Sequence, residues 1–181
     1  MNMPTTEEVK AFYRERQKSP KISSRKIFIL NQMSKLIKPN MSVLDVGCGD
    51  GINVAGMSCY TKKIAGCDLD VTNVKRNIPA IQTFPLDITK DRIKPCATAD
   101  IVTLFDVLEH IPGNTENFVL ESLVEATNKY LVINTPLGLD DDQILERQVN
   151  VPKVVAFLNG HLDLYYAERY EQYLFMVWRV R

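Results

Sequence analysis

The sequence predicts an α/β fold in which a doubly wound, mostly parallel sheet carries helices on both faces. Two observations predict it: short apolar runs alternate with helix-like segments from residue 41 onward, and several of these runs are apolar throughout. Strands that are apolar on both sides are typical of parallel sheets covered by helices. The chain has 181 residues, which suits one structural domain. Within it we expect a helical cap over residues 1–40 and the main domain over residues 41–181.

Two helices are expected in the first forty residues. The first begins near Thr5, ahead of an acidic first turn. The second is capped by Ser23 or Ser24, and its apolar residues recur at helical spacing until the chain reaches Pro39.

Five strands and three helices are expected to alternate after residue 41. The strands are Ser42–Val46, Lys63–Cys67, Ala80–Phe84, Asp100–Phe105 and Tyr130–Asn134, and the helices are Ile52–Tyr60, Val71–Asn77 and Asn114–Asn128. Asp70 is the expected cap of the second of these helices. In parallel sheets of this kind a ligand binds outside the carboxyl ends of the strands, so functional residues are expected directly after each strand.

The first predicted strand is followed by five residues with G-x-G-x-G spacing, Gly47 to Gly51. Glycines allow a sharp turn and let bare backbone approach a ligand, although a simple tight turn needs them too. A dinucleotide fingerprint requires G-x-G-x-x-G, whereas position 52 is isoleucine, and no Gly-Lys-Ser/Thr of a Walker loop follows. The spacing favours a ligand without a pyrophosphate and argues against a nicotinamide dehydrogenase.

Carboxylates follow the second and third predicted strands. Asp68 is placed to accept two hydrogen bonds from a ribose diol, and the alternative role of helix cap is filled better by Asp70. Asp87, between Leu86 and Ile88, can accept from the exocyclic amine of a flat ring such as adenine. A surface-turn aspartate is the alternative there.

The fourth predicted strand ends at Phe105 and leads into three polar residues. Asp106, Glu109 and His110 have i, i+3, i+4 spacing, so on one helical turn they would share a face that points into the same crevice.

The order of these motifs resembles class I, Rossmann-like S-adenosylmethionine-dependent methyltransferases. The matching segments are residues 44–51, 66–69, 86–88 and 106–111. The resemblance implies S-adenosylmethionine as cofactor, with its methionine part near the glycines, its ribose at Asp68 and its adenine amine near Asp87. The cofactor-binding residues expected on this basis are Asp45, Gly47, Cys48, Gly49, Asp68, Leu69, Asp87, Ile88, Phe105 and Asp106. Arg25 resembles an arginine that some relatives use on the cofactor carboxylate.

Two departures from these relatives concern the sheet and the lid. Relatives usually end with a sixth and a seventh strand, whereas here only Phe175–Val180 is expected after a final helix, which predicts a shortened carboxyl-terminal edge. The chain also lacks a sizeable insertion that would form a substrate lid. Recognition of the methyl acceptor is therefore expected from the amino-terminal helices, residues 137–160 and a second subunit in a homodimer.

The two histidines are the candidates for binding or deprotonating the methyl acceptor. His110 is the expected general base, because imidazole titrates near neutral pH. His161, expected ahead of a helix, resembles a histidine that lines the substrate pocket in relatives. Together with Asp106 and Glu109, the two histidines resemble the metal-binding set of RNA 3′-end 2′-O-methyltransferases, with aspartate in place of the first glutamate. A metal-free pocket is favoured, and packing and capping roles for Glu109 and His110 stay open.

The expected function is transfer of a methyl group from S-adenosylmethionine to an unidentified oxygen, nitrogen or carbon nucleophile by in-line displacement. The alternatives are the metal-assisted RNA enzyme and a non-catalytic S-adenosylmethionine-binding protein. A small-molecule acceptor is favoured, because 22 basic and 22 acidic residues give no net charge that would support nucleic acid. The sequence shows no signal peptide, no apolar stretch near eighteen residues and no C-x-x-C pair. The expected location is therefore the cytoplasm, without membrane contact.

Overall fold

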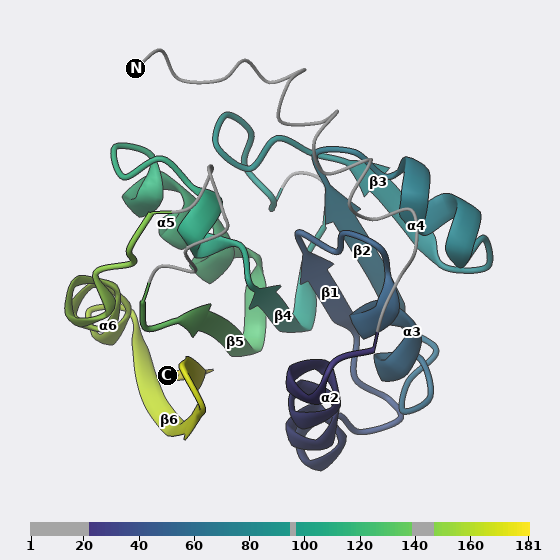
Figure 1. Ribbon diagram of the computed structural model, residues 1–181, viewed down its shortest axis with the longest axis horizontal. Helices are drawn as coiled ribbons and strands as arrows, with labels where there is room; N and C mark the ends of the chain where they lie inside the picture. Colours follow the sequence, from purple (N-terminus) through teal and green to yellow (C-terminus); the bar gives the residue numbers. More distant parts are fainter. Residues whose placement is uncertain (1–21, 95–96, 139–146) are drawn as a thin grey trace.

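A seven-stranded sheet forms the centre of the computed structural model, which describes residues 22–94, 97–138 and 147–181. Its strands are β1 (Val43–Val46), β2 (Ile64–Asp68), β3 (Gln82–Pro85), β4 (Ala99–Phe105), β5 (Thr127–Pro136), β6 (Leu162–Tyr170) and β7 (Tyr173–Val180). Their order is β3-β2-β1-β4-β5-β7-β6, with β1 to β5 parallel and β7 antiparallel to both of its neighbours (Figure 1). The predicted mostly parallel α/β fold is confirmed.

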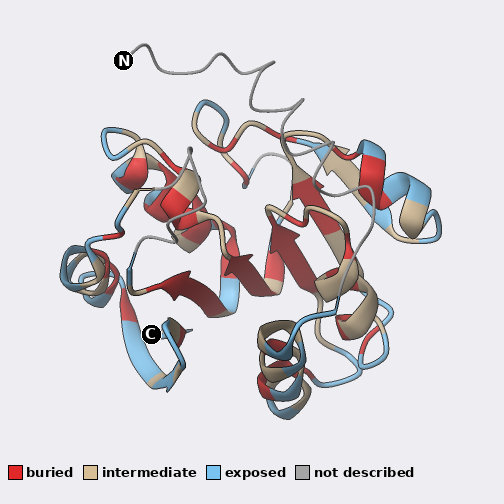
Figure 2. Ribbon diagram, viewed as in Figure 1, coloured by how far each residue is buried: buried red, intermediate tan, exposed pale blue. Residues whose placement is uncertain are grey.

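Helices cover both faces of this sheet. They are α2 (Ser24–Leu36), α3 (Ile52–Met57), α4 (Thr72–Asn77), α5 (Glu116–Ala126) and α6 (Val151–Asn159), with a 3₁₀ turn, η1 (Leu108–His110). α2 and α3 pack on one face, and α5 and α6 pack on the other (Figure 1). β7 divides its side chains between the two layers, because Phe175 and Val177 face α2 while Met176 and Trp178 face α5 and α6. β1 is buried along its whole length, and β4 and β5 are buried over residues 101–105 and 131–136 (Figure 2).

The second predicted helix is observed as α2. The Ser23 hydroxyl oxygen accepts a hydrogen bond from the Lys26 main-chain N–H at 3.3 Å and caps the helix. Ile29 and Met33 are fully buried against the sheet, so this part of the expected 1–40 cap shares the core of the main domain. The helix predicted near Thr5 lies outside the described residues.

The prediction of a shortened carboxyl-terminal edge was wrong. Residues 162–170 form the edge strand β6 rather than a helix, and β7 begins at Tyr173. Most side chains of β6 are exposed, so the segment lacks the apolar run by which the inner strands were recognised. Its tyrosines are compatible with a strand, and Glu171, with φ of 52°, forms the tight turn into β7.

The remaining predicted elements are present with shifted ends. α3 ends at Met57 rather than Tyr60, and β5 is longer than predicted at both ends. Among the described residues, no helix combines the length and the apolar character needed to cross a membrane.

Candidate functional site

The loop that follows β1 is built on glycines in the left-handed region. Gly47, Gly49 and Gly51 have φ angles of 74°, 53° and 83°, which side chains disfavour. A Cβ atom on Gly47 would also lie 2.3 Å from Cγ2 of Val107, in the segment that follows β4. The predicted glycine requirement at Gly47 is therefore both conformational and steric.

Four of the five N–H groups of this loop donate hydrogen bonds within the protein. Those of Gly47 and Cys48 donate to the Cys67 carbonyl at 2.8 and 3.0 Å, and that of Gly51 donates to the Cys48 carbonyl at 2.9 Å. That of Gly49 donates to the carboxylate of Asp68 at 2.8 Å. Phosphate-binding loops use such N–H groups on their ligand. The geometry agrees with a ligand that has no pyrophosphate.

Asp68 stands at the carboxyl end of β2, directly beside the glycine loop. Its Oδ2 accepts from Gly49 N–H, and its Oδ1 accepts from Asp70 N–H at 3.2 Å. Burial raises the pKa of this carboxyl, while the main-chain N–H groups oppose the rise. A carboxylate offers about four acceptor positions, so room remains for a diol. Its role on a ribose stays a prediction.

Asp87 is more fully engaged than the sequence suggested. Its Oδ1 accepts from the N–H and hydroxyl of Thr89 at 3.2 and 2.6 Å, and its Oδ2 pairs with the Lys90 ammonium at 2.7 Å. Burial would raise the pKa of Asp87, but these hydrogen bonds hold it below its usual value. One side of the carboxylate is thus occupied by a local turn, and contact with an adenine amine stays a prediction.

The apolar residues predicted near the cofactor lie mostly in the core. Cys48, Ile88 and Phe105 are buried, whereas Leu69 is half-buried next to Asp68. Burial is also the main cause that raises the pKa of the Cys48 thiol, which makes this cysteine a packing group rather than a nucleophile.

A charged network is centred on Asp106, at the carboxyl end of β4. Asp106 has φ of 56°, an uncommon conformation for a residue with a side chain. Its carboxylate lies 3.1 Å from the Arg25 guanidinium and accepts from the Asn134 amide at 2.7 Å, and its N–H donates to the Asn134 carbonyl at 2.9 Å. Burial raises the pKa of Asp106, and the Arg25 charge opposes that rise. Arg25 also lies over the Tyr173 ring, 4.3 Å from its centre.

Sequence reasoning missed Asn134 and Tyr173. Asn134 could have been noticed, because it is a polar residue at the end of an apolar strand, whereas nothing in the local sequence marks Tyr173. Within the described part of the chain, Arg25 Nε and Asn134 Oδ1 are buried without a hydrogen-bond partner. One is a donor and the other an acceptor, so the network has unused hydrogen-bonding capacity of both kinds.

Asp45 lies inside the sheet, below the glycine loop. It is 2% exposed, and its Oδ1 accepts a hydrogen bond from the Thr103 hydroxyl at 2.6 Å. Burial raises its pKa to about 7, and the charge of Asp68 adds to the rise. Asp45 therefore links β1 to β4 inside the sheet, and direct contact with a cofactor stays a prediction.

The raised pKa of Asp45 predicts a pH-dependent stability. Because its pKa is about 7 in the folded protein against an ordinary 3.8, the folded state binds the extra proton below pH 7, and stability falls as the pH rises through 7. We expect this group to remove about 2–3 kcal/mol of stability between pH 5 and pH 8. Asp45→Asn should remove that part of the pH dependence, measured by urea unfolding at both values. Equal pH dependence in the variant and the parent protein would contradict the prediction.

The turn after β4 is a 3₁₀ turn rather than an α-helical one. Leu108 and Glu109 are buried and His110 is half-buried, so the three polar residues do not share one open face. His110 remains near the carboxyl end of β4, where a base was predicted.

The prediction that His161 shares this pocket does not hold. His161 precedes β6, which runs parallel to β5, so it lies at the amino-terminal edge of the sheet, opposite Asp106. It is exposed and stacks on Phe157, with ring centres 4.9 Å apart. Among the described residues, no three histidine, cysteine, aspartate or glutamate side chains are grouped to hold a metal ion, so the proposed four-residue metal set is not assembled.

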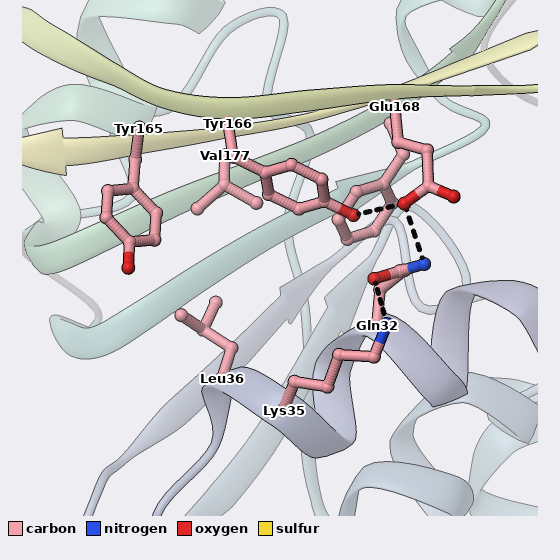
Figure 3. A pocket seen from close by; sticks show the side chains of 8 residues that line it. Gln32, Lys35, Leu36, Tyr165, Tyr166, Glu168 and Val177 are labelled. Carbon is pink, nitrogen blue, oxygen red and sulfur yellow. Dashed lines mark hydrogen bonds between the residues drawn. The ribbon is translucent and has the colours of Figure 1, made fainter.

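A pocket of about 290 Å³ lies between the second half of α2 and the β6–β7 hairpin (Figure 3). Its polar side is a chain of hydrogen bonds, in which Lys35 donates to Gln32, and both Gln32 and the Tyr166 hydroxyl donate to Glu168. An irregularity of β6 between Leu164 and Tyr166 brings two adjacent tyrosines to this pocket. None of its lining residues belongs to the ends of β1 to β4, so it is separate from the site described above.

Comparisons with known proteins agree with this geometry. A family model described as a methyltransferase domain matches residues 15–174. A probable S-adenosylmethionine-dependent methyltransferase of Mycobacterium tuberculosis is 28% identical over 98 residues, which cover 52% of this chain and 35% of that protein. The chain thus matches about a third of the length of this curated relative.

Solved structures share the fold at low sequence identity. A TehB-like SAM-dependent methyltransferase from Corynebacterium glutamicum has a TM-score of 0.72 and 16% identity, with 97% of this chain and 98% of that chain covered. Magnesium protoporphyrin IX methyltransferase from Synechocystis PCC 6803, solved with bound SAM, has a TM-score of 0.74 and 12% identity, and each chain is covered completely. At such identities the likeness concerns the fold.

Proposed function

The chain belongs to the methyltransferase domain family, and from that premise we propose that it transfers a methyl group from S-adenosylmethionine to a nucleophile of a small molecule. The observation that carries the proposal is the pairing of Asp68 with the glycine loop at the carboxyl edge of β1 and β2. The N–H groups of Gly47, Cys48, Gly49 and Gly51 donate hydrogen bonds within the protein, so they are not available to a pyrophosphate. Asp68 can still accept hydrogen bonds from a ribose.

The residues of this edge fit the chemical groups of the cofactor. Asp68 would hold the ribose hydroxyls, and the orphaned donor of Arg25 and acceptor of Asn134 suit the carboxylate and ammonium of an amino acid. At Gly47 the absence of a side chain lets Val107 pack directly against the glycine loop, so the two segments that follow β1 and β4 lie in contact. When bound, the sulfonium supplies an electrophilic methyl group, so the protein mainly aligns the acceptor and excludes water.

On the acceptor side, His110 is the proposed base. A base is needed only for a protonated amine or a weakly acidic hydroxyl, and an imidazole is suited to either near neutral pH. The proposal covers oxygen, nitrogen and carbon acceptors.

Isothermal titration with S-adenosylhomocysteine and with NAD⁺ tests the cofactor. We expect micromolar binding of the former and none of the latter. Transfer of a labelled methyl group from S-adenosylmethionine to a panel of small amines, phenols and carboxylates then tests turnover. The proposal fails if S-adenosylhomocysteine does not bind at millimolar concentration.

A shortened carboxyl-terminal edge of the sheet would have favoured the non-catalytic alternative, but β6 and β7 complete that edge. The RNA alternative depended on a metal held by four side chains, of which His161 lies at the opposite edge. Binding of cofactor without transfer to any member of the panel would favour the non-catalytic alternative.

A further inference from the structure

Arg147 connects three parts of the chain that are far apart in sequence. Its main-chain N–H donates to the Glu109 carbonyl at 2.8 Å, and its Nε donates to the Ile111 carbonyl. Its Nη2 donates to the carboxylate of Glu116, the first residue of α5. Arg147, which lies between β5 and α6, thus binds both the turn after β4 and the start of α5.

Glu116 fixes the direction of the guanidinium. Its side chain is only 2% exposed, and it also pairs with the Lys153 ammonium from α6 at 3.2 Å. A buried carboxylate needs a cationic partner, because an unpaired charge in the core is costly, and Glu116 therefore holds the guanidinium beside it. The Arg147 side chain is therefore held in place where it meets the turn.

The turn η1 depends on donors from outside. Its own hydrogen bonds run from His110 N–H to the Val107 carbonyl and from Ile111 N–H to the Leu108 carbonyl, which is the weaker 3₁₀ pattern. Arg147 supplies the hydrogen bonds to two carbonyls of this short segment, those of Glu109 and Ile111. The segment starts at Val107, whose side chain packs against the backbone of Gly47. A displacement of this turn would move His110 and also Val107, which packs against the glycine loop.

We propose that Arg147 is a positioning residue for methyl transfer, which holds η1 so that His110 faces the acceptor and Val107 packs against the glycine loop. The inference rests on the proposed function. Arg147 acts through the turn and is not expected to touch the cofactor itself.

Arg147→Lys is the main test variant, because it keeps a positive charge for Glu116 but loses the planar fork that serves Ile111 and Glu116 together. Lys153→Gln is the matched control, because Lys153 pairs with the same carboxylate and, among the described residues, makes no hydrogen bond or ion pair with the turn. The chain has only two histidines, so the imidazole C2–H signals in a proton NMR spectrum can be assigned with the single variant His161→Gln.

In the parent protein we expect saturating S-adenosylhomocysteine to shift the His110 signal. In Arg147→Lys that shift should fall at least twofold, and hydrogen exchange at the Ile111 N–H should rise at least tenfold. Lys153→Gln should leave both values unchanged, and the His161 signal should stay constant in all proteins. Affinity for S-adenosylhomocysteine in Arg147→Lys should remain within about threefold of the parent value.

The proposal is overturned if Arg147→Lys and the parent protein show the same ligand-induced shift of the His110 signal and the same exchange rate at the Ile111 N–H. It is also overturned if Lys153→Gln changes both quantities as much as Arg147→Lys does. If Arg147→Lys does not fold, Glu116→Gln takes its place, because it frees the guanidinium while keeping the arginine. It should reduce the His110 shift in the same direction. Absence of S-adenosylhomocysteine binding to the parent protein would defeat the proposed function, whereas the exchange measurement at Ile111 would still decide the role of Arg147.

Discussion

Gly47→Ala is expected to lower the melting temperature by roughly 5–15 °C and to weaken S-adenosylhomocysteine binding at least about tenfold. With φ of 74°, an alanine at position 47 would occupy the left-handed region, which costs about 1–2 kcal/mol. Its Cβ would also lie 2.3 Å from Val107 Cγ2, and overpacking of this kind costs about 1–3 kcal/mol. The loop must move to relieve the contact, and the ligand surface moves with it.

Two further variants separate these causes. Gly113→Ala is the matched control, because no heavy atom lies within 4 Å of the Cβ it would add, and its φ is not in the left-handed region. It should leave both melting temperature and affinity unchanged. Val107→Ala combined with Gly47→Ala removes the clash but keeps the backbone strain, so it should recover part of the loss. Thermal unfolding and titration calorimetry provide the measurements, and a Gly47→Ala protein that behaves like Gly113→Ala would contradict the steric account.

The parts of the site that could be predicted from sequence are those set by local pattern. β1 and the glycines after it are adjacent in the chain, and an apolar run followed by G-x-G-x-G predicts a strand and a sharp turn at once. Asp68 follows a second apolar run, and parallel strands bring their carboxyl ends to one edge. Each step uses neighbouring residues or a general rule of parallel sheets. The proximity of Asp68 and Gly49 could therefore be predicted from the sequence.

The parts that could not be predicted depend on long-range pairing. His161 was assigned to the pocket because it resembles a pocket histidine of relatives, and a helix was expected after it, yet the segment after it forms β6, which pairs with β7 and starts at the opposite edge of the sheet. The Asp106 network takes Arg25 from α2 and Asn134 from β5, and their convergence follows from packing rather than from spacing. β6 escaped notice for a related reason, since an exposed edge strand has no need of the apolar alternation that marks a buried one.

Asp68→Asn is expected to weaken S-adenosylhomocysteine binding by about 10- to 100-fold while leaving the protein folded. Hydrogen bonds to a charged acceptor contribute about 1.5–3 kcal/mol, and each 1.4 kcal/mol changes affinity tenfold. The amide oxygen can still accept from Gly49 N–H, so the loop keeps its tie to β2. The amide NH2 of asparagine cannot accept from Asp70 N–H, but removal of a buried charge offsets that loss, so the stability at pH 8 should change by less than about 1 kcal/mol. Loss of affinity without loss of stability is the signature of a ligand contact.

Asp70→Asn is the matched control for this prediction. Asp70 lies two residues further along and accepts from Thr72 N–H at 2.8 Å, a task that asparagine performs equally well. Its affinity for S-adenosylhomocysteine should equal that of the parent protein. A comparison of S-adenosylhomocysteine with its 2′-deoxy analogue sharpens the test, since the parent protein should prefer the natural ligand at least about tenfold and Asp68→Asn should nearly lose that preference. If Asp68→Asn weakens both ligands by the same factor, the carboxylate acts through the glycine loop, and the ribose contact must be assigned to another residue.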